Sequence, residues 1–487
     1  MTHSPALVAI DLGADSCRVS LLQGQQESAT PTISIVHRFP NAPWVPDSAE
    51  GPTGIRWNLE RMCEELLAAL HACAECAPEG IAGIGVTGWA VDYVRLDASG
   101  QPLAPPFCYR DPRTNAAVAA VHDRIPAEQL YAQTGVQIQP LNTIYQLYAD
   151  KLAGVPADAP WVNLPEYILH WLGAPRVAEF TNATHTALVA PDTRTWSDEI
   201  FSALGLDRGA APELVASGTS LGHLRADLRR IPAFADTQLI APACHDTASA
   251  LAGIPAHPSR QPGNWAYISS GTWSLIGMVL AESRRSPEAC ALGFTNLGAV
   301  GGGVLFHRGI PGMWLLRQCL NTWEAERGWS LVELIAESRS LPASHTLLDL
   351  DDPAFIPPGN MPARINEQRR RQRSMLLSEE PDAAPLYANL IFRSLANRYA
   401  TVLADITRLT GQRPQRLCVV GGANRNDYLN DLTAAATGIP VERCAVESST
   451  LGNFAVQLAR LGQRTDGVTA EAIAEHARTL ADAPIIA

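Results

Sequence analysis

The sequence predicts an α/β protein made of two halves, and three observations carry that prediction. Short apolar runs with strand character alternate with segments whose apolar residues recur at helical spacing. Two strand–turn–strand units stand out, one at 7–22 with a polar turn at 13–17, the other at 265–278 with a polar turn at 270–272. Both turns contain glycine, and each unit opens one half of the α/β pattern. Strands interspersed with helices in this way predict a mixed sheet covered by helices.

The first half contains further strands at 33–36 and 81–86, with a helix between them. Asn58 is a good N-cap for that helix. The apolar residues that follow at helical spacing are Leu59, Met62, Leu66, Leu67 and Leu70. The order strand, strand, strand, helix, strand favours a mixed sheet over a simple doubly wound nucleotide fold.

The region 113–235 is richer in proline and helical segments, and we interpret it as an insertion or a cap. A strand at 238–241 then leads through a polar turn into a helix that opens near Ala248. Apolar residues keep helical phase from 386 to 406, which predicts a long packed helix before a strand at 417–420.

The segment 351–375 is rich in proline and is expected to be irregular. Its basic run at 369–373 has two interpretations, a solvated helix face or a contact with a partner or nucleotide.

Composition narrows the class of protein. At roughly 100–200 residues per domain, 487 residues correspond to two to four domains. With 46% hydrophobic and 18% charged residues the chain is not a disordered polymer. The net charge of −12 disfavours binding to nucleic acid. Lys151 is the sole lysine, so the sequence has no GxxxxGK[ST] phosphate loop, and a lysine Schiff base is disfavoured.

The sequence contains no membrane-spanning run of ~18–20 apolar residues. The start of the chain lacks a basic region followed by an apolar run and a cleavage site. The ten cysteines are dispersed, as in proteins of a reducing compartment. We therefore expect a soluble cytoplasmic protein.

Two turns are suited to hold phosphate without lysine. Successive main-chain N–H groups in a tight turn form an anion nest, and the turns at 13–18 and 269–272 combine glycine with hydroxyl residues. Asp11 ends the strand before the first turn and is placed to hold Mg²⁺ through water. Each turn is equally compatible with an ordinary hairpin, and that alternative stays open.

Several other residues are candidates for a sugar site. Asp246 stands between a strand and a helix, where it could accept a proton from an alcohol or simply cap the helix. His245 could bind a polyol or be a buried structural histidine. Trp89 and Asp92 pair an aromatic face with a carboxylate, as sugar sites do, although a core tryptophan is as common. Gly421-Gly422 could admit an adenosine or form a tight connection.

The order of these pieces resembles the FGGY family of carbohydrate kinases, and within it the kinases of L-rhamnulose. The motifs that carry the resemblance are Asp11-Leu12-Gly13-Ala14, Tyr109-Arg110-Asp111, Cys244-His245-Asp246-Thr247-Ala248, Ser269-Ser270-Gly271-Thr272-Trp273 and Val420-Gly421-Gly422. Further matches are 36–39, 141–147, Glu179-Phe180-Thr181-Asn182-Ala183-Thr184 and Glu447-Ser448-Ser449-Thr450-Leu451-Gly452-Asn453. The resemblance covers the chain from about residue 6 to about residue 460.

The resemblance implies an actin/hexokinase-like fold, in which two RNase H-like domains hold ATP and sugar in an interdomain cleft. It implies an N-terminal sugar-binding domain at 1–256, a C-terminal nucleotide-binding domain at 257–465 and a tail at 466–487. The implied reaction transfers the γ-phosphoryl group of ATP, with Mg²⁺, to the C1 hydroxyl of a ketose such as L-rhamnulose. The expected partners are a small-molecule ketose, with no nucleic acid and no membrane, and the expected state is a monomer or a homodimer.

Site roles follow from the same resemblance. It implies that Asp246 is the catalytic base. The sugar would be bound by His245, Asp246 and Thr247, with Trp89, Ala90 and Asp92 beside them. The ATP-binding positions would be Ala14, Asp15, Ser16, Cys17, Arg18, Thr272, Arg317 and Gly422, and Asp11 would hold the metal.

The chain departs from the family pattern at several positions. At the sugar pocket it has Thr87-Gly88-Trp89-Ala90 where these kinases tend to have Asp-Thr-Trp-Gly. Gly309 replaces an asparagine that touches the sugar, and Arg317 replaces a glutamine on the ATP side. In the first turn Asp15 replaces a hydroxyl residue and Cys17 a glycine. A lost polar contact shifts discrimination between substrates by a few kcal/mol, so the ketose itself is left open.

Three hypotheses of function therefore remain: a kinase of L-rhamnulose, a kinase of L-fuculose or another ketose, and a non-catalytic actin-fold protein that senses sugar and nucleotide. The altered first turn, with Asp15 and Cys17, motivates the last hypothesis. The retained His245-Asp246-Thr247 set argues against it, because a sensor needs no base.

Overall fold

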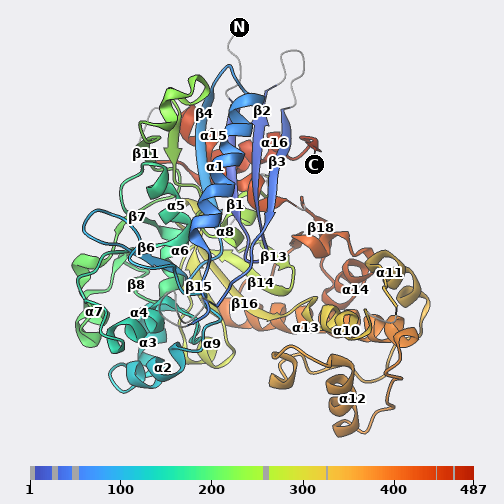
Figure 1. The fold of residues 1–487 in the computed structure, drawn as a ribbon. Helices are drawn as coiled ribbons and strands as arrows, with labels where there is room; N and C mark the ends of the chain where they lie inside the picture. Colours follow the sequence, from blue (N-terminus) through green and yellow to red (C-terminus); the bar gives the residue numbers. More distant parts are fainter. Residues whose placement is uncertain are drawn as a thin grey trace. The chain divides into compact units, whose positions relative to one another are not determined.

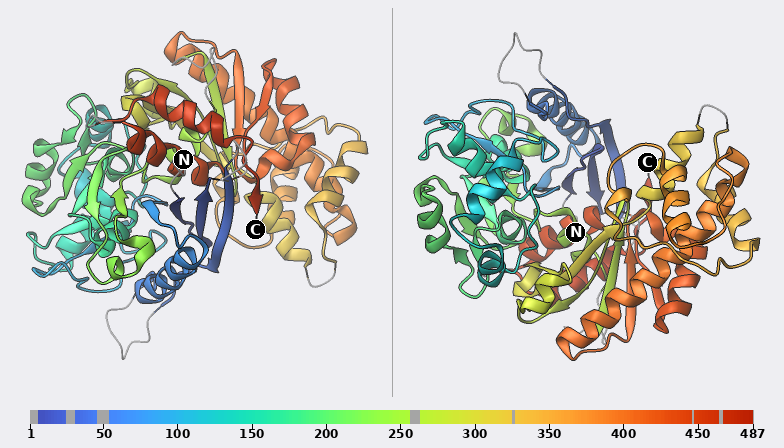
Figure 2. Two further views of the ribbon diagram at one scale, coloured as in Figure 1. Left: turned by 90° about the horizontal axis from the view of Figure 1, so that it is seen from above. Right: turned by 90° about the horizontal axis from the view of Figure 1, so that it is seen from below.

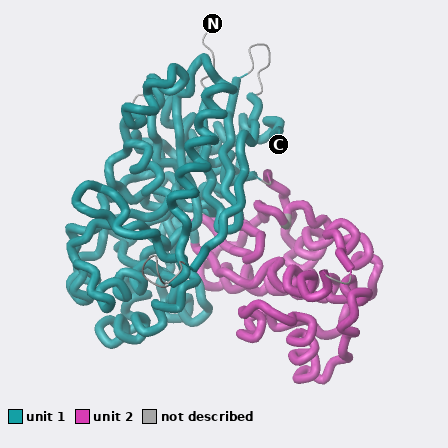
Figure 3. Tube along the Cα trace, viewed as in Figure 1, with its two compact units in different colours: residues 1–257, 281–305, 447–487 teal, residues 258–280, 306–446 magenta. Residues whose placement is uncertain are grey.

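The computed structural model of the chain describes residues 6–24, 31–45, 54–255, 263–324, 327–445, 447–463 and 467–486 (Figure 1). They form two compact units (Figure 3). Unit 1 comprises residues 1–257, 281–305 and 447–487, and unit 2 comprises residues 258–280 and 306–446. Segments distant in sequence thus share unit 1. The expected domain boundaries at 256 and 465 fall outside the described residues, and that division remains a prediction.

Unit 1 is built on a mixed sheet with strand order β11-β12-β4-β1-β2-β3-β19. The strands are β1 (Ala6–Leu12), β2 (Ser16–Gln23), β3 (Thr32–Pro40), β4 (Ile81–Gly88), β11 (Ser220–His223), β12 (Gln238–Ile240) and β19 (Ile485–Ile486). β2 runs antiparallel to β1, whereas β4 runs parallel to β1 and β12 parallel to β4. The predicted mixed sheet is therefore confirmed. The carboxyl ends of the parallel strands β1, β4 and β12 lie at one edge of it, where α/β proteins place their ligands.

Helices cover both faces of this sheet. α1 (Leu59–Cys76) and α15 (Ser448–Gly462) lie on opposite sides, as the views in Figure 2 show. Asn58 caps α1 as predicted, because its side chain accepts a hydrogen bond of 3.0 Å from the N–H of Arg61. The 2.0-residue period of a strand turns alternate side chains of β4 toward opposite faces.

Glycines on one face of β4 let α15 approach closely. A side chain at Gly83 or Gly85 would press on Gln457 or Asn453 of α15. Asn453 donates to the carbonyl of Gly85 at 3.1 Å, and Gln457 donates to that of Val8 at 2.9 Å. The two glycines of β4 thus allow α15 to pack closely against the sheet.

The helix α8 (Asp246–Ala252) crosses α15 with almost no space between the two backbones. A Cβ on Gly452 would overlap the carbonyl oxygen of Ser249, and one on Gly253 would overlap that of Ser448. The hydroxyl of Ser249 donates to the carbonyl of Ser449 at 2.8 Å. This crossing joins the start of α15 to the helix that begins at Asp246.

We expect Gly452→Ala to destabilise the protein by about 3 kcal/mol, because overpacking against backbone cannot be relieved by a rotamer change. Urea unfolding measures the effect. Gly462→Ala is the matched control at the end of the same helix, since its nearest neighbour, the ring of His476, would lie 4.0 Å away. Equal stability of the two variants would contradict this description of the crossing.

The region 113–235 packs beside the sheet in unit 1. Its helices are α2 (Thr114–His122), α3 (Ala127–Thr134), α4 (Thr143–Leu152), α5 (Leu164–Leu172), α6 (Phe180–Ala183) and α7 (Asp198–Leu204). Short strands lie before and between them: β5 (Tyr93–Arg95), β6 (Trp161–Asn163), β7 (Val177–Glu179), β8 (Val189–Ala190), β9 (Thr195–Trp196) and β10 (Glu213–Val215). The helical segments are confirmed, whereas the short strands were not predicted. Unit 1 also contains α9 (Pro287–Ala291), β15 (Thr295–Gly298) and α16 (Ala470–Leu480).

Unit 2 has its own sheet, in which β16, β14, β13, β17 and β18 are neighbours in that order. The strands are β13 (Trp265–Ser270), β14 (Trp273–Leu280), β16 (Val304–Pro311), β17 (Arg416–Val420) and β18 (Val441–Arg443). The helices are α10 (Trp314–Trp323), α11 (Leu331–Ser340), α12 (Met361–Arg371), α13 (Ala384–Thr410) and α14 (Asp427–Thr437). The second strand–turn–strand unit and the long helix before β17 are confirmed.

The prediction that 351–375 is irregular is wrong for its centre, where α12 forms. Asn360 caps this helix by accepting from the N–H of Ala363 at 3.1 Å, and Pro362 stands in its first turn, where proline is tolerated. The basic run ends the helix. Arg369 is buried and donates to the carbonyl of Met375 at 2.8 Å, and Arg371 forms an ion pair with Asp352.

The first hairpin also has a shorter turn than predicted. Ser16 and Cys17 already belong to β2, where they pair with Pro40 and Phe39, so the turn is limited to 13–15. Across the described residues, no helix is both long and apolar enough to cross a membrane.

Candidate active site

The edge of the unit 1 sheet gathers three chain segments that are far apart in sequence. Asp11 pairs with Thr87 near the ends of β1 and β4, and Gly88 forms a parallel bridge with His245. The N–H of Gly88 donates to the carbonyl of Cys244 at 2.9 Å. The backbone thus places the end of β1, the end of β4 and the start of α8 next to one another.

Asp246 is the first residue of α8. The N-cap position belongs to His245, so the interpretation of Asp246 as the helix cap is wrong. The Asp246 side chain is 42% exposed, and one of its oxygens accepts from the Thr247 hydroxyl at 3.1 Å. Burial of the surrounding site raises its pKa, while the Thr247 hydrogen bonds and the charge of Arg18 oppose the rise. The Asp246 carboxylate is therefore accessible, and its neighbours limit the rise of its pKa, so it can serve as a general base.

His245 lies beneath this carboxylate. Its Nε2 is 3.2 Å from Oδ1 of Asp246, and burial lowers its pKa to about 3, so the ring is neutral. Its Nδ1 has no hydrogen-bond partner in the described part of the chain. His185 packs against the ring with centroids 3.9 Å apart. The Nδ1 nitrogen of His245 is buried within the described structure, and His185 is a neighbour that the sequence motifs do not identify.

Arg18, whose charge lowers the pKa of Asp246, belongs to a network of ion pairs. Nε of Arg18 lies 3.1 Å from Oδ2 of Asp11, and the hydroxyl of Ser449 donates to the same oxygen at 2.5 Å. Arg18 also pairs with Glu447, whose other oxygen is 3.5 Å from Arg38. The sequence motifs assign Arg18 to ATP, but they do not show that Glu447 pairs with Arg18 or that Ser449 bonds to Asp11, because these partners come from the far end of the sequence.

Asp11 is buried, and its burial raises the pKa of the carboxyl against the opposing charge of Arg18. The negative charge of Asp246 raises it further, so the two carboxylates lie close enough to interact. The described residues contain no cluster of three or more metal-ligating side chains. One carboxylate with a second nearby fits Mg²⁺, which is held by one or two carboxylates while substrate phosphates and water supply the rest.

The first turn is tightly built. A Cβ on Gly13 would overlap the carbonyl oxygen of Ser16. Asn41 donates to the carbonyls of Gly13 and Asp15, both at 3.0 Å, which fixes the turn against the end of β3. Ala14 is half-buried and Asp15 exposed. Burial raises the pKa of the Cys17 thiol to about 12, so Cys17 is an inert space-filling group here.

Asp92 lies below the site rather than in it. It is 0% exposed, and one of its oxygens accepts from the indole N–H groups of Trp57 at 2.6 Å and Trp89 at 2.9 Å. Gln146 donates to its other oxygen at 3.2 Å. Burial raises its pKa to about 6. The prediction that Asp92 binds sugar does not agree with this burial, and the carboxylate is placed to orient Trp89 instead.

Val91 lies between Ala90 and Asp92 with φ of 72°, a conformation that β-branched residues rarely adopt. Thr143 and Gln146 of α4 donate to its carbonyl at 2.7 and 3.2 Å. Backbone strain that hydrogen bonds hold in place is typical of functional sites. Here it fixes the backbone conformation next to Ala90. Ala90 is one of the positions where the chain departs from the family pattern.

Three of the predicted nucleotide-binding residues, Thr272, Arg317 and Gly422, lie in unit 2. The carbonyl of Thr272 accepts from the N–H groups of Gly312 at 3.0 Å and Trp314 at 3.1 Å, which ties this turn to the start of α10, the helix that carries the exposed Arg317. Gly421 has φ of 85°, and a Cβ there would lie 2.7 Å from the carbonyl oxygen of Ser270.

The neighbouring residue in unit 2, Gly422, is exposed and has open space where a side chain would project. The parallel strands β13 and β17 pair as far as Ser269 and Val420, so their carboxyl ends are adjacent. Gly309, a predicted departure on the sugar side, lies in β16 with Leu275 as its nearest neighbour.

Comparison with known proteins decides the family. The models of the N-terminal and C-terminal domains of the FGGY family of carbohydrate kinases match residues 6–253 and 266–461. The chain belongs to the FGGY family of carbohydrate kinases. The resemblance drawn from the motifs is therefore confirmed, and the protein is a carbohydrate kinase.

Individual relatives agree. A rhamnulokinase of Enterococcus faecalis is 34% identical over 461 residues, which cover 94% of this chain and 90% of that protein. A rhamnulokinase of Bacteroides thetaiotaomicron is 34% identical over 463 residues, covering 94% of this chain and 91% of that protein. Among solved structures, a xylulose kinase of Lactobacillus acidophilus is similar with a TM-score of 0.77 at 15% identity, covering 97% of this chain and 92% of that one. The predicted actin/hexokinase-like fold class is confirmed.

Proposed function

We propose that this kinase transfers the γ-phosphoryl group of ATP to the C1 hydroxyl of L-rhamnulose. The observation that carries the proposal is the identity of 34–35% to rhamnulokinases over 94% of the chain. The accessible Asp246, in contact with the neutral His245 at the edge of the sheet, supports it from the side of the chemistry.

Asp246 accepts or directs the proton of the attacking hydroxyl. Its carboxylate is the exposed acid of the cluster, whereas Asp11 and Asp92 are buried. His245 and Trp89 help to orient the ketose, His245 beside the Asp246 carboxylate and Trp89 through an indole fixed by Asp92. Thr247 keeps one oxygen of Asp246 in a hydrogen bond, which leaves the other free for the hydroxyl.

The phosphate groups require compensation of their negative charge, which is the main contribution of proteins to phosphoryl transfer. Arg18 and the amides of the first turn provide it in unit 1. In unit 2, the residues that bind the nucleotide are Thr272, Arg317 and Gly422. Asp11 would hold Mg²⁺, which supplies charge neutralisation on the phosphates.

A coupled ADP-release assay over a panel of ketoses tests the proposal. We expect L-rhamnulose to give the highest kcat/KM, by about tenfold or more over L-fuculose and D-xylulose, because a few misplaced hydroxyls cost that much. Phosphorus NMR should place the new phosphate on C1.

Two outcomes would contradict it in different ways. Higher kcat/KM with L-fuculose or another ketose would assign that sugar, and would trace the change to Ala90 and Gly309. Sugar and nucleotide binding without ADP release from any ketose would indicate a sensor.

A further inference from the structure

Two buried glutamates lie behind the candidate active site and take no part in the proposed reaction. Glu166 belongs to α5 and Glu179 ends β7, and both side chains are 0% exposed. The N–H of Glu179 donates to Oε1 of Glu166 at 3.0 Å. Buried carboxylates are costly unless their hydrogen bonds are complete, so their partners show what they do.

Every acceptor position of Glu179 is filled by a donor. Oε1 accepts from the N–H of Thr181 at 3.1 Å and from the hydroxyl of Ser217 at 2.7 Å. Oε2 accepts from the hydroxyl of Thr181 at 2.5 Å and from the N–H of Cys244 at 2.9 Å. Burial raises the pKa of Glu179, and these four hydrogen bonds oppose the rise because they stabilise the ionised form.

Glu166 differs from its neighbour. One oxygen accepts from Glu179 and the other from the amide of Asn182 at 2.8 Å, which leaves room for a proton. Burial and the negative charge of Glu179 raise the pKa of Glu166 to about 8. Burial thus favours a proton on this pair of carboxyls, and Glu166 has the more open position for it.

The bond from Glu179 to Cys244 reaches the catalytic segment. The Cys244 peptide is held on both sides, its N–H by Glu179 and its carbonyl by the N–H of Gly88 at 2.9 Å. His245 and Asp246 follow directly. Glu179 thus ties the residues before α8 to the end of β7, while Gly88 ties them to the end of β4, and the two bonds together fix where α8 begins.

We propose that Glu179 is a positioning residue for Asp246, acting through its hydrogen bond to the Cys244 peptide. This inference rests on the proposed role of Asp246 as the base. A misplacement of about 1 Å in a reacting group lowers the rate by about 100-fold, so a single bond at this junction has a large effect on kcat.

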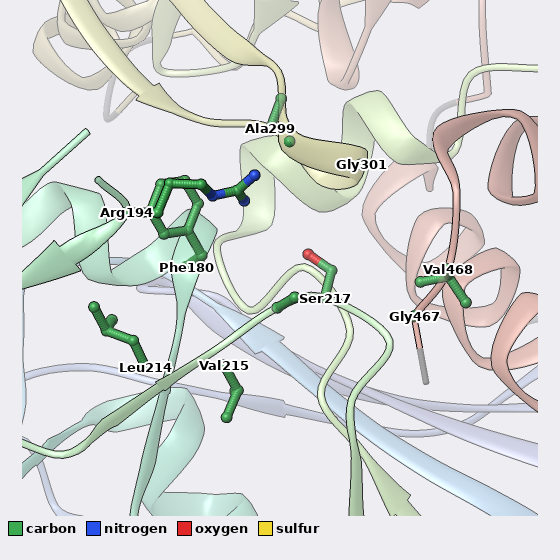
Figure 4. Close-up of a pocket in the computed structure, with 11 residues that line it drawn as sticks. Phe180, Arg194, Leu214, Val215, Ser217, Ala299, Gly301, Gly467 and Val468 are labelled. Carbon is green, nitrogen blue, oxygen red and sulfur yellow. The ribbon is translucent and has the colours of Figure 1, made fainter. Parts of the chain in front are cut away.

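A cavity of about 250 Å³ adjoins this network at Ser217, which donates to Glu179. Ser217 lies on its wall together with Phe180, Arg194 and Val468, and Figure 4 shows the Ser217 hydroxyl among these side chains. Removal of the Ser217 hydroxyl takes away one of the four donors to Glu179, which provides a mild perturbation of that carboxylate.

The test compares Glu179→Gln with Glu166→Gln. At Glu179 the new amide would face a donor whichever way it turns. At Glu166 the amide of Asn182 can turn over, because its Oδ1 has no partner among the described residues, and accept from the new group. We expect Glu179→Gln to lower kcat by about 10- to 100-fold, with the KM for ATP unchanged. Glu166→Gln should stay close to wild type.

Nucleotide-binding stoichiometry, measured by calorimetry, separates positioning from loss of folded protein. It should remain at the wild-type value in Glu179→Gln. If that variant does not fold, Thr181→Val and Ser217→Ala each remove one donor to Glu179 and should lower kcat by about 3- to 10-fold at full binding stoichiometry. Wild-type kcat in Glu179→Gln, or in both milder variants, would overturn the inference. A wild-type protein without ketose kinase activity, or an active Asp246→Ala variant, would instead overturn the proposed function.

Discussion

Replacement of Asp246 by asparagine is expected to lower kcat by about 10³-fold, while ATP binding changes little. The amide keeps the size of the carboxylate and can still bond to Thr247, but it cannot accept a proton. General base catalysis contributes about 10²- to 10⁴-fold in enzymes, and Asp246 is the exposed acid of the described cluster. ADP release at saturating ketose measures kcat, and calorimetry measures ATP binding.

The control for Asp246→Asn is Asp97→Asn, a partly exposed aspartate of unit 1 that bonds only to its own turn in the described structure. It should behave as wild type. Activity of Asp246→Asn within about threefold of the control would remove the base from the mechanism, since a loss that small is far below the range for a general base.

Replacement of Arg18 by methionine is expected to lower kcat by about 100-fold and to shift the acidic limb of its pH profile to higher pH. The guanidinium lowers the pKa of both Asp11 and Asp246. Without it both carboxyls hold their protons to higher pH, so the base becomes available only at higher pH. Loss of a charge-stabilising donor accounts for a decrease of about 100-fold in phosphoryl transfer.

Arg38→Met provides the comparison, because Arg38 pairs with Glu447 but does not act on Asp246. It should change kcat by less than about threefold, as expected for a half-exposed ion pair. The pH profile of kcat from pH 5 to 9 distinguishes the two variants. An unshifted acidic limb in Arg18→Met would mean that Arg18 does not govern the Asp246 carboxyl.

Local features of the site could be predicted from the sequence. The strand–turn–strand signal around 13–17 located Asp11 and Arg18, and the polar junction at 242–247 located Asp246. Such signals lie within about ten residues of one another, where the period of the side chains and the turn residues suffice. Motif order along the chain then supplied the family.

Partners that meet through tertiary packing could not be predicted. Glu447 reaches Arg18 only because Gly83 and Gly85 let α15 pack closely on the sheet, while Gly452 lets it pack closely on α8. Glu179 reaches Cys244 only because β7 ends beside the start of α8. Burial also could not be predicted for Asp92. Its carboxylate is a good sugar ligand by type, but in the structure it is enclosed by two tryptophans.

The error at 351–375 has a physical cause of the same kind. A proline-rich segment predicts a break in regular structure, yet Pro362 stands at a helix start, where its missing N–H is not needed. Asn360 supplies the cap. Proline position relative to a cap, rather than proline content, predicts the helix.

A crystal structure with L-rhamnulose and a non-hydrolysable ATP analogue tests the central claim most directly. The account predicts the C1 hydroxyl within about 3 Å of the Asp246 carboxylate, as a general base requires, with the nucleotide contacting Thr272 and Gly422. A ketose whose C1 hydroxyl points away from Asp246, toward another acid or toward solvent, would contradict it.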